Sequence, residues 1–177
     1  MSIQGLIKNN IDELNEIQQR LDETQLTVIA GKLIGANRIF FSGMGRSGNM
    51  VKALAIRFMH LGYDAYVAGD AATPSISKGD VLVAVSSSGK TNVTMNHLET
   101  AKKNGGTTVL ISSVRENPER SDCYLCIPAK TEVASTQHAG SLFEQSVLIV
   151  GDALSSYIQS KENISTEYMN DRHANLQ

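Results

Sequence analysis

The sequence has little charge imbalance, no block of like charges and no long hydrophobic run. Its 177 residues carry a formal net charge of −2, so no basic surface for nucleic acid or for an anionic membrane is expected. Residues 1–20 are polar and helix-periodic and lack the apolar core of an export signal, and no later run of about 18 apolar residues would span a bilayer. We therefore expect a cytoplasmic protein that binds small molecules and further copies of itself.

Cysteine and tryptophan are also scarce, with two Cys and no Trp. Cys123 and Cys126 form a C-x-x-C pattern, but their segment has the composition of a strand. Side chains three positions apart on a strand point to opposite faces, so the two thiols would diverge. We predict two separate thiols that pack as small hydrophobic residues, not a redox or metal centre. No other group of residues has metal-ligand spacing, and we predict neither a metal nor another cofactor.

The residues that are plentiful predict a single α/β domain. Hydrophobic residues make up 41% of the chain, enough for one sizeable core. The alternation of strand, turn and helix, with almost continuously apolar strands, is typical of a parallel sheet that is covered by helices on both faces. The predicted strands span 38–42, 65–68, 81–86, 107–112 and 123–128, and the helices between and after them span 47–61, 91–104 and 141–160.

Two helices are predicted before the sheet and a tail after it. Leu and Ile recur every three or four positions between residues 3 and 21, which indicates an amphipathic helix that packs on a partner element or subunit. A second helix begins near Thr24 and ends at Gly35. The tail from Glu162 to Gln177 is polar and is expected to be irregular. The chain 1–177 is thus predicted to be one domain with N-terminal helices at 3–35 and a tail at 162–177.

A glycine-rich turn follows the first predicted strand. In FFSGMGRSGN the glycines form G-x-G-x-x-G, the pattern of a dinucleotide-binding turn, and Asp70 lies where a ribose-binding acid is expected. Against a dinucleotide, one domain with five strands has no second mononucleotide-binding half. Arg46 and Ser47 also place a charge and a hydroxyl group where a dinucleotide turn relies mainly on backbone groups.

The third predicted strand runs into a turn that is rich in hydroxyl groups, VSSSGKT. Hydroxyl and free N–H groups at the start of a helix bind anions, so this turn predicts a phosphate site. The same residues nearly spell a Walker A loop, but its first glycine is missing and no later strand ends in an acid suited to magnesium. Two neighbouring turns of this kind favour a compact phosphorylated polyol over a nucleoside triphosphate.

Moving a proton next to a sugar carbonyl requires a side chain that acts as a base. Glu144 is the main candidate, because it lies at the start of an apolar helix whose entry loop follows the last predicted strand. Its alternative role is structural, since Ser141 and Glu144 have the spacing of a capping box. His60 has the position of a histidine at a helix C-terminus, and His173 lies in the polar tail.

Four motifs in order resemble the 6-phospho-3-hexuloisomerase family of the SIS (sugar isomerase) domain group. They are SGMGRSGNMVKALAIRFMHLG, the serine-rich turn, GSLFEQSVLIVGDA and RHANLQ, and the resemblance spans nearly the whole chain. It implies a flavodoxin-like five-stranded parallel sheet of order 2-1-3-4-5 and a tetramer. It also implies interconversion of 3-hexulose 6-phosphate and fructose 6-phosphate, in formaldehyde assimilation by the ribulose monophosphate pathway or in pentose supply.

The same resemblance implies roles for particular residues. Glu144 would be the base that moves a proton between C2 and C3 through an enediol, with no cofactor. The turn that contains Gly45 would bind the sugar phosphate rather than a dinucleotide. The other implied site residues are Ser47, Ser86, Ser88 and Thr91, which would bind phosphate or nearby hydroxyl groups, and Arg46, His60 and His173, which would line the pocket, some of them from a neighbouring subunit.

Three positions depart from the family pattern. Lys90 replaces an acidic residue of the serine turn, His138 and Ala139 replace a Pro-Met pair, and the last residue is Gln177 instead of Glu. The change at 138–139 lies on the approach to Glu144 and leaves an isomerase of a related phosphorylated ketose as an alternative. A non-catalytic sugar-phosphate sensor is another alternative, made less favourable by the lack of an attached DNA-binding region in this sequence.

Overall fold

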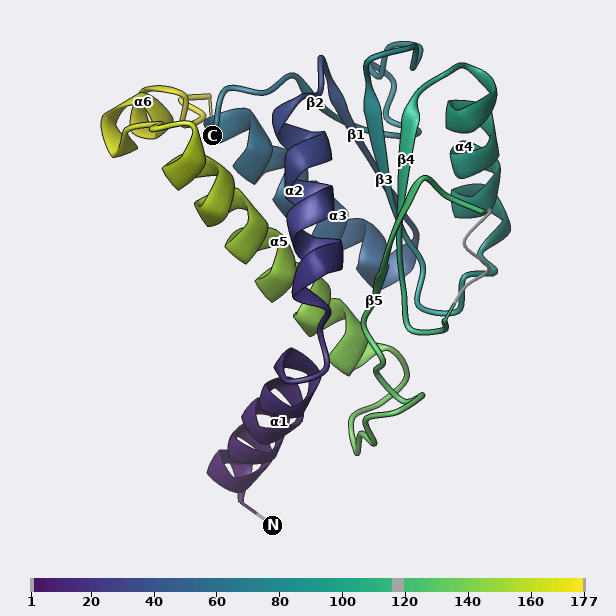
Figure 1. The fold of residues 1–177 in the computed structure, drawn as a ribbon. Coiled ribbons are helices and arrows are strands. Elements are labelled where there is room, and N and C mark those ends of the chain that lie inside the picture. Colours follow the sequence, from purple (N-terminus) through teal and green to yellow (C-terminus); the bar gives the residue numbers. More distant parts are fainter. Residues whose placement is uncertain (1, 116–119, 177) are drawn as a thin grey trace.

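The core of the fold is a parallel sheet of five strands (Figure 1). The computed structural model describes residues 2–115 and 120–176. The strands are hydrogen-bonded in the order β2-β1-β3-β4-β5, and each neighbouring pair is parallel. The predicted strand order and direction are therefore confirmed. The bounds are β1 (Ile39–Gly43), β2 (Ala65–Val67), β3 (Val81–Val85), β4 (Thr107–Ser112) and β5 (Cys123–Cys126).

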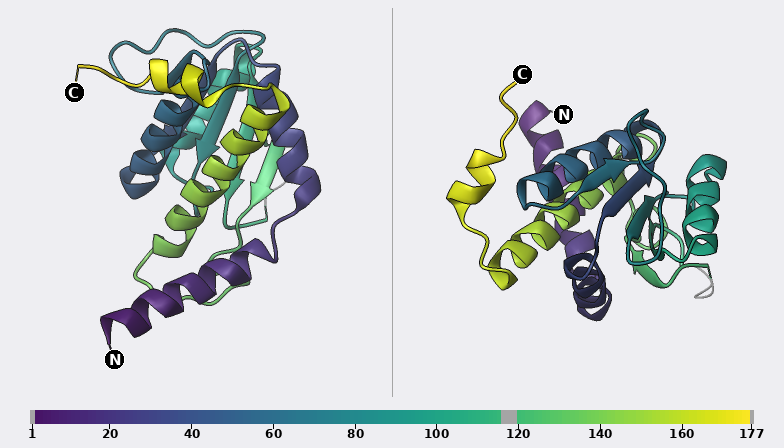
Figure 2. Two further views of the ribbon diagram at one scale, coloured as in Figure 1. Left: turned by 90° about the vertical axis from the view of Figure 1, so that its left-hand side faces the viewer. Right: turned by 90° about the horizontal axis from the view of Figure 1, so that it is seen from above.

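Four helices cover the two faces of the sheet unequally (Figures 1 and 2). A layer of α2 (Glu23–Ile34), α3 (Gly45–His60) and α5 (Ser141–Lys161) packs on one face, and α4 (Asn92–Lys103) packs on the other. Side chains alternate between these layers along each strand, so Phe41 packs with the three-helix layer and Phe40 packs with α4. Because both faces are buried, the strands have almost continuously apolar sequences.

The first helix, α1 (Ile3–Gln18), extends away from the sheet (Figures 1 and 2). Near its C-terminal end Ile17 is buried and Leu14 packs against the core. The apolar side chains of its N-terminal half, by contrast, are exposed. The amphipathic helix is confirmed, although it ends at Gln18 and not at residue 21.

The tail contains a further helix, α6 (Thr166–Asp171), so the expectation of an irregular tail is wrong. The Ser165 side chain caps this helix by accepting a hydrogen bond from the backbone N–H of Tyr168. Arg172 holds the tail on the end of α3, because its Nε donates to the carbonyl oxygen of Met59 at 2.8 Å. A helix this short has no apolar periodicity to detect and depends on capping and docking for its stability.

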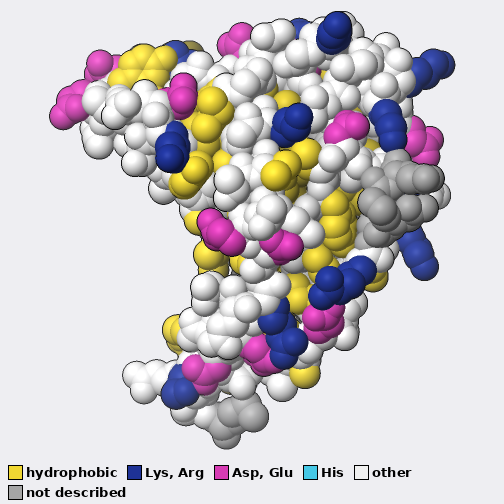
Figure 3. All heavy atoms as spheres, viewed as in Figure 1, with side chains coloured by type: hydrophobic (Ala, Val, Ile, Leu, Met, Phe, Trp, Pro, Cys, Tyr) yellow, Lys and Arg dark blue, Asp and Glu magenta, His cyan; other side chains and the backbone are white. Residues whose placement is uncertain are grey.

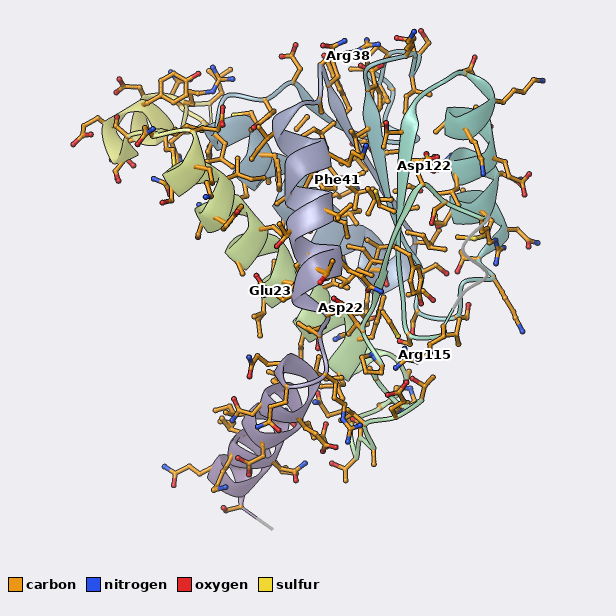
Figure 4. All side chains as sticks on the ribbon, in the orientation of Figure 1. Asp22, Glu23, Arg38, Phe41, Arg115 and Asp122 are labelled. Atoms are coloured by element: carbon orange, nitrogen blue, oxygen red, sulfur yellow. The ribbon has the colours of Figure 1, made fainter. Side chains whose placement is uncertain are left out.

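The strands point their carboxyl ends toward one edge of the sheet. In Figure 4, Arg38 and Asp122, which precede β1 and β5, lie above Arg115, which follows β4. At the amino edge Arg38 pairs with the buried carboxylate of Asp80 at 2.7 Å. Burial raises the pKa of the Asp80 carboxyl, but hydrogen bonds from Arg38 and Ser77 outweigh it and lower that pKa. The amino edge is thus closed by structural contacts, and the carboxyl edge is the one available for ligands.

Both cysteines lie on β5 and are free thiols. Cys123 is buried and Cys126 is partly buried, and in each case burial is the main cause that raises the pKa of the thiol. A raised pKa lowers the thiolate fraction and hence the reactivity of both side chains. The prediction of two separate, unpaired thiols is confirmed.

Candidate active site

A cavity of about 400 Å³ opens at the carboxyl edge of the sheet. It lies where the β1–α3 turn, the β3–α4 turn and the loop between β5 and α5 meet. Pockets of this size hold small ligands. The polar residues that line it are Ser47, Ser86, Ser87, Ser88, Thr91, Ser113, Lys130 and Thr131. The structure therefore brings together four of the predicted substrate-binding residues, namely Ser47, Ser86, Ser88 and Thr91.

Three helices begin at this cavity without a capping side chain. The N-cap residues of α3, α4 and α5 are Met44, Thr91 and Gly140, and all three line the cavity. Among the described residues no side chain caps these three helices, whereas α1, α2 and α6 each begin with a capping serine or aspartate. Free amide groups and the positive ends of helix dipoles both attract anions. The helices that begin at the cavity are thus the ones left free to bind a phosphate group.

The hydroxyl groups of the β3–α4 turn contact one another and a serine of the loop after β4. Ser86 Oγ lies 3.0 Å from Thr91 Oγ1, and Ser87 Oγ lies 3.0 Å from Ser113 Oγ. Thr91 occupies the N-cap position, yet its hydroxyl contacts Ser86 and not the helix amides. Each hydroxyl group retains hydrogen-bonding capacity for a ligand. Helix capping therefore does not account for this turn, and its hydroxyl groups are available as a phosphate-binding set.

The glycines of the β1–α3 turn serve mainly to pack backbone against backbone. A Cβ atom at Gly48 would lie 2.9 Å from the carbonyl oxygen of Gly43, which is too close for any side chain. Gly45 has a φ of +59°, a conformation that favours glycine, and has open space around it. The G-x-G-x-x-G pattern therefore reflects a tight strand-to-helix turn, a requirement that this fold shares with dinucleotide-binding folds.

Glu144 lies beside the cavity and is paired with Arg46. Arg46 Nε donates to Glu144 Oε2, which joins the first turns of α3 and α5. A Cβ atom on the cavity-lining Gly140 would lie 3.2 Å from Glu144 Oε1, so the carboxylate is close to the cavity wall. The Glu144 side chain is 11% exposed and the Arg46 side chain is 64% exposed. The carboxylate is thus shielded and held in place, while the guanidinium group faces solvent.

The capping-box alternative for Glu144 is wrong. The N-cap of α5 is Gly140, and Ser141 Oγ donates to the carbonyl oxygen of His138 at 2.8 Å. The carboxylate of Glu144 contacts Arg46, which is 98 residues away in the sequence. A capping box is a local pattern, and here a distant cation takes the place of the local partner.

His60 and His173 lie together, but away from the cavity. Their rings stack with centroids 5.0 Å apart and an interplanar angle of 20°. Burial is the main cause that lowers the pKa of His60, and His173 and nearby arginines lower it further. His60 ends α3 and Arg46 lies in its first turn, so about 20 Å of helix separates them. Within one chain the structure does not bring the two histidines to Glu144.

Three polar residues of the cavity were missed by sequence reasoning, namely Ser113, Lys130 and Thr131. They follow β4 and β5, and the rule that ligands bind at the carboxyl ends of parallel strands indicates the loops after these strands, 113–121 and 129–141, without singling out these residues. Thr131 Oγ1 donates to the carbonyl oxygen of Ser113 at 2.8 Å, which links the two loops. Lys130 adds a positive charge to the lining.

Two of the three departures from the family pattern, at 138–139 and at Lys90, lie at or next to this cavity. Ala139 lines it in a left-handed conformation with a φ of +47°, and His138 directly precedes it. Lys90 is exposed next to the serine turn, and its backbone N–H donates to Ser88 Oγ at 3.2 Å. Gln177 lies outside the described residues.

Neither metal-ligand clusters nor membrane-spanning helices are found in the described part of the chain. Across residues 2–115 and 120–176, no three or more His, Cys, Asp or Glu side chains gather as metal ligands do. No described helix combines the length and the apolar composition needed to cross a bilayer. That the reaction needs no cofactor stays a prediction.

Comparison with known proteins identifies the family. The SIS domain model matches residues 32–150. The 3-hexulose-6-phosphate isomerase of Mycobacterium gastri is 36% identical and the alignment covers 97% of this chain and 92% of the relative; that of Bacillus subtilis is 30% identical, with 94% and 95% covered. A Methanococcus jannaschii protein, whose crystal structure infers a function of 3-hexulose-6-phosphate isomerase, matches with a TM-score of 0.84 at 30% identity over 98% of both chains. The chain therefore belongs to the SIS domain family and is similar over nearly its whole length to 3-hexulose-6-phosphate isomerases.

Proposed function

We propose that this protein interconverts 3-hexulose 6-phosphate and fructose 6-phosphate through an enediol, without a cofactor. The observation that carries the proposal is the Glu144–Arg46 pair, which lies beside a cavity suited to a phosphate group. Identity of 30–36% to 3-hexulose-6-phosphate isomerases supports the choice of substrate.

The phosphate group is expected to bind in the serine turn at the start of α4. Ser86, Ser88 and Thr91 supply hydroxyl groups there, and the free amides of α4 supply further donors. A hydrogen bond to a charged group contributes about 1.5–3 kcal/mol, and a helix N-terminus contributes about 0.3–1 kcal/mol. Several such donors are needed to hold a dianion, which explains why this turn carries hydroxyl groups in such number.

In the proposed reaction Glu144 removes the proton from C2 of the 3-keto sugar. The oxygen on C3 gains a proton, and the 2,3-enediol forms. Glu144 then returns its proton to C3 while the hydroxyl group on C2 loses one, which leaves the ketone at C2 and no atom gained or lost. Arg46 would stabilise negative charge on the enediolate oxygens. Its guanidinium group is suited to this role because it lies beside the base and faces solvent at the mouth of the site.

We also propose that copies of the chain assemble, as a tetramer, and that His60 and His173 reach the cavity of a neighbouring subunit. A second cavity, of about 580 Å³, lies between α1, α2 and α5 and is lined mainly by aliphatic side chains. It is larger than the cavity at the carboxyl edge but suits a protein contact better than a phosphate. Figure 3 shows the molecule indented between α1 and α6, with hydrophobic side chains in the indentation. Exposed apolar surface of this kind marks interaction sites.

The test is an assay of the purified protein against a panel of phosphorylated ketoses, with enzymatic detection of fructose 6-phosphate. Glu144→Gln is expected to lower kcat by about 10²–10⁴, because the base is lost, while fructose 6-phosphate still binds in calorimetry. Glu162→Gln, at the exposed C-terminal end of α5, is the matched control and should keep full activity.

Each other outcome assigns a different role. Full turnover by the Glu144→Gln protein would show that Glu144 is not the base. If the protein turned over only a different phosphorylated ketose, that related ketose would be its substrate. Binding of fructose 6-phosphate by the unaltered protein without turnover of any ketose would make the chain a sensor.

A further inference from the structure

Glu13, on α1, is a buried acid that the reaction proposed above does not use. It is 8% exposed, although α1 extends away from the sheet and most of its polar side chains face solvent. Apart from Asn9 on α1 itself, the groups that contact its carboxylate come from the loop between β5 and α5, more than 120 residues away in the sequence. Figure 1 and the left-hand view of Figure 2 both place α1 beside this loop.

Five hydrogen bonds converge on this carboxylate, all from neutral donors. Oε2 accepts from Ser135 Oγ at 2.7 Å and from Gln137 Nε2 at 2.9 Å. Oε1 accepts from the backbone N–H of Thr136 at 2.9 Å, from Thr136 Oγ1 at 3.1 Å and from Asn9 Nδ2 at 3.0 Å. Burial raises the pKa of Glu13, but the hydrogen bonds from the loop outweigh burial and lower that pKa to about 2. The group is therefore an ionised acceptor throughout the neutral range.

The loop that Glu13 holds continues directly into the wall of the active-site cavity. Residues 135–137 are followed by Ala139 and Gly140, which both line that cavity. Ala139 has a φ of +47°, a conformation that L side chains rarely adopt, so surrounding contacts must hold it. Gly140 is next to the Glu144 carboxylate, and its carbonyl oxygen accepts from the Glu144 backbone N–H at 2.9 Å.

We propose that Glu13 is a positioning residue for the isomerase reaction, because it fixes the 135–140 loop and through it the place of the Glu144 carboxylate at the cavity. This inference rests on the proposed function. A carboxylate suits the task, since both of its oxygens accept hydrogen bonds only. In Glu13→Gln, the side-chain NH₂ group would face donors from the loop and could not accept their hydrogen bonds. Proton transfer depends steeply on the distance and orientation of the base, whereas the serine turn proposed to bind the phosphate belongs to the β3–α4 connection and, among the described residues, makes no hydrogen bond to Glu13.

The test compares Glu13→Gln with Glu16→Gln, a change of the same type one turn further along α1. Glu16 is exposed, and within the described part of the chain its ion pair is a local one, with Arg20 at 3.0 Å. Glu13→Gln is expected to lower kcat about tenfold while KM for the sugar phosphate changes less than about twofold. Glu16→Gln should leave both constants unchanged. A folded Glu13→Gln protein with the unaltered kcat would overturn the inference, and so would a rise in KM without a fall in kcat.

A second variant keeps the test valid if Glu13→Gln does not fold. Gln137→Ala removes one of the five donors and leaves the acid in place, so a fall in kcat of about two- to threefold is expected, again without a matching rise in KM. An unchanged kcat in this variant would count against the inference in the same way.

Hydrogen exchange separates this inference from the proposed function. In Glu13→Gln, the backbone amides of residues 135–140 should exchange faster than in the unaltered protein, and those of the serine turn should not. If the unaltered protein shows no isomerase activity, the proposed function fails, and the exchange data still report whether Glu13 holds the loop. Equal exchange of residues 135–140 in both proteins would overturn the inference whether or not the protein is an isomerase.

Discussion

At the scale of single residues, Glu13 and Glu144 show that the role of an acidic side chain depends on its contacts in the folded protein. Glu144 follows Ser141 at the spacing of a capping box, but it pairs with Arg46 on another helix. Glu13 has the sequence context of an ordinary surface acid on an amphipathic helix, yet five hydrogen bonds surround it. Apart from Asn9 on α1, the partners lie on other elements, so no local pattern reveals them.

Replacing Ser86 should weaken substrate binding more than turnover. Its side chain is buried at the cavity and contacts Thr91 Oγ1 at 3.0 Å. Ser86→Ala removes a donor that would contact the phosphate equally in the ground state and in the transition state, so KM should rise about tenfold with kcat nearly constant. Steady-state kinetics measures both constants. Ser155→Ala, a buried serine of α5 that donates to Asp152, is the control and should change neither.

The Glu13 carboxylate should also make stability depend on pH. Its pKa is about 2 in the folded protein against an ordinary value of 4.5, so its stabilising effect is complete above pH 4.5 and is lost as the pH falls from 4.5 toward 2. Between pH 7 and pH 3 the unaltered protein should therefore lose about 2 kcal/mol more unfolding free energy than Glu13→Gln. Urea denaturation of both proteins at the two pH values measures the difference. Parallel losses in the two proteins would show that Glu13 contributes nothing in this range.

At the scale of elements, the strands were the most predictable part of the fold. Segments such as Val81–Val85 and Thr107–Ser112 are apolar because the sheet is covered on both faces, and the predicted bounds 81–86 and 107–112 agree with the structure to within one residue. The helix α6 was missed because its six residues depend on the Ser165 cap and on Arg172, which docks on α3. A strand that is buried on both faces has an apolar pattern that can be recognised in the sequence. Docking contacts such as that of Arg172 join residues far apart in the sequence and leave no such pattern.

The β1–α3 turn allows a direct test of why its glycines are there. Gly48→Ala would place a Cβ 2.9 Å from the backbone oxygen of Gly43, so it should destabilise the protein by about 1–3 kcal/mol. Gly31→Ala in α2 is the matched control, because a Cβ there meets nothing within 4 Å and alanine favours the helix by up to about 1 kcal/mol. Thermal or urea unfolding of the two variants gives the comparison. Equal stability of both variants would show that the turn relaxes at no cost.

At the scale of the whole molecule, the position of the binding site was predictable and its full composition was not. Parallel strands bring their carboxyl ends to one edge, so the serine turn and the glycine turn were expected to be neighbours, and the cavity lies between them. The loop of residues 129–140 was expected at the same edge because it follows the last strand, but it carries no recognisable motif, so which of its residues line the cavity follows only from the path of the chain between β5 and α5. The four-subunit assembly, the cytoplasmic location and the role of the histidine pair stay predictions.

Self-association should depend on the exposed apolar stripe of α1. Ile7 is 54% exposed and Ile11 is 51% exposed on a helix that extends away from the sheet. The double change Ile7→Lys and Ile11→Lys should lower the molar mass in solution, because it places two charges where apolar surface would be buried. Val28→Lys, at an exposed site of α2 outside the apolar cavity, is the control. Light scattering measures the mass of each variant, and an unchanged mass for the double variant would exclude this stripe from the interface.

The three uncapped helices at the cavity affect how stable the protein is against unfolding with and without a bound ligand. If a phosphate ester binds there as proposed, it would accept hydrogen bonds from these helix N-termini, and occupancy of the cavity would add to the free energy of unfolding. A ligand present at about 100 times its Kd adds about 2.7 kcal/mol in this way. The thermal stability of the protein would then rise with the concentration of the sugar phosphate, and dialysis into a phosphate-free buffer would give its least stable form.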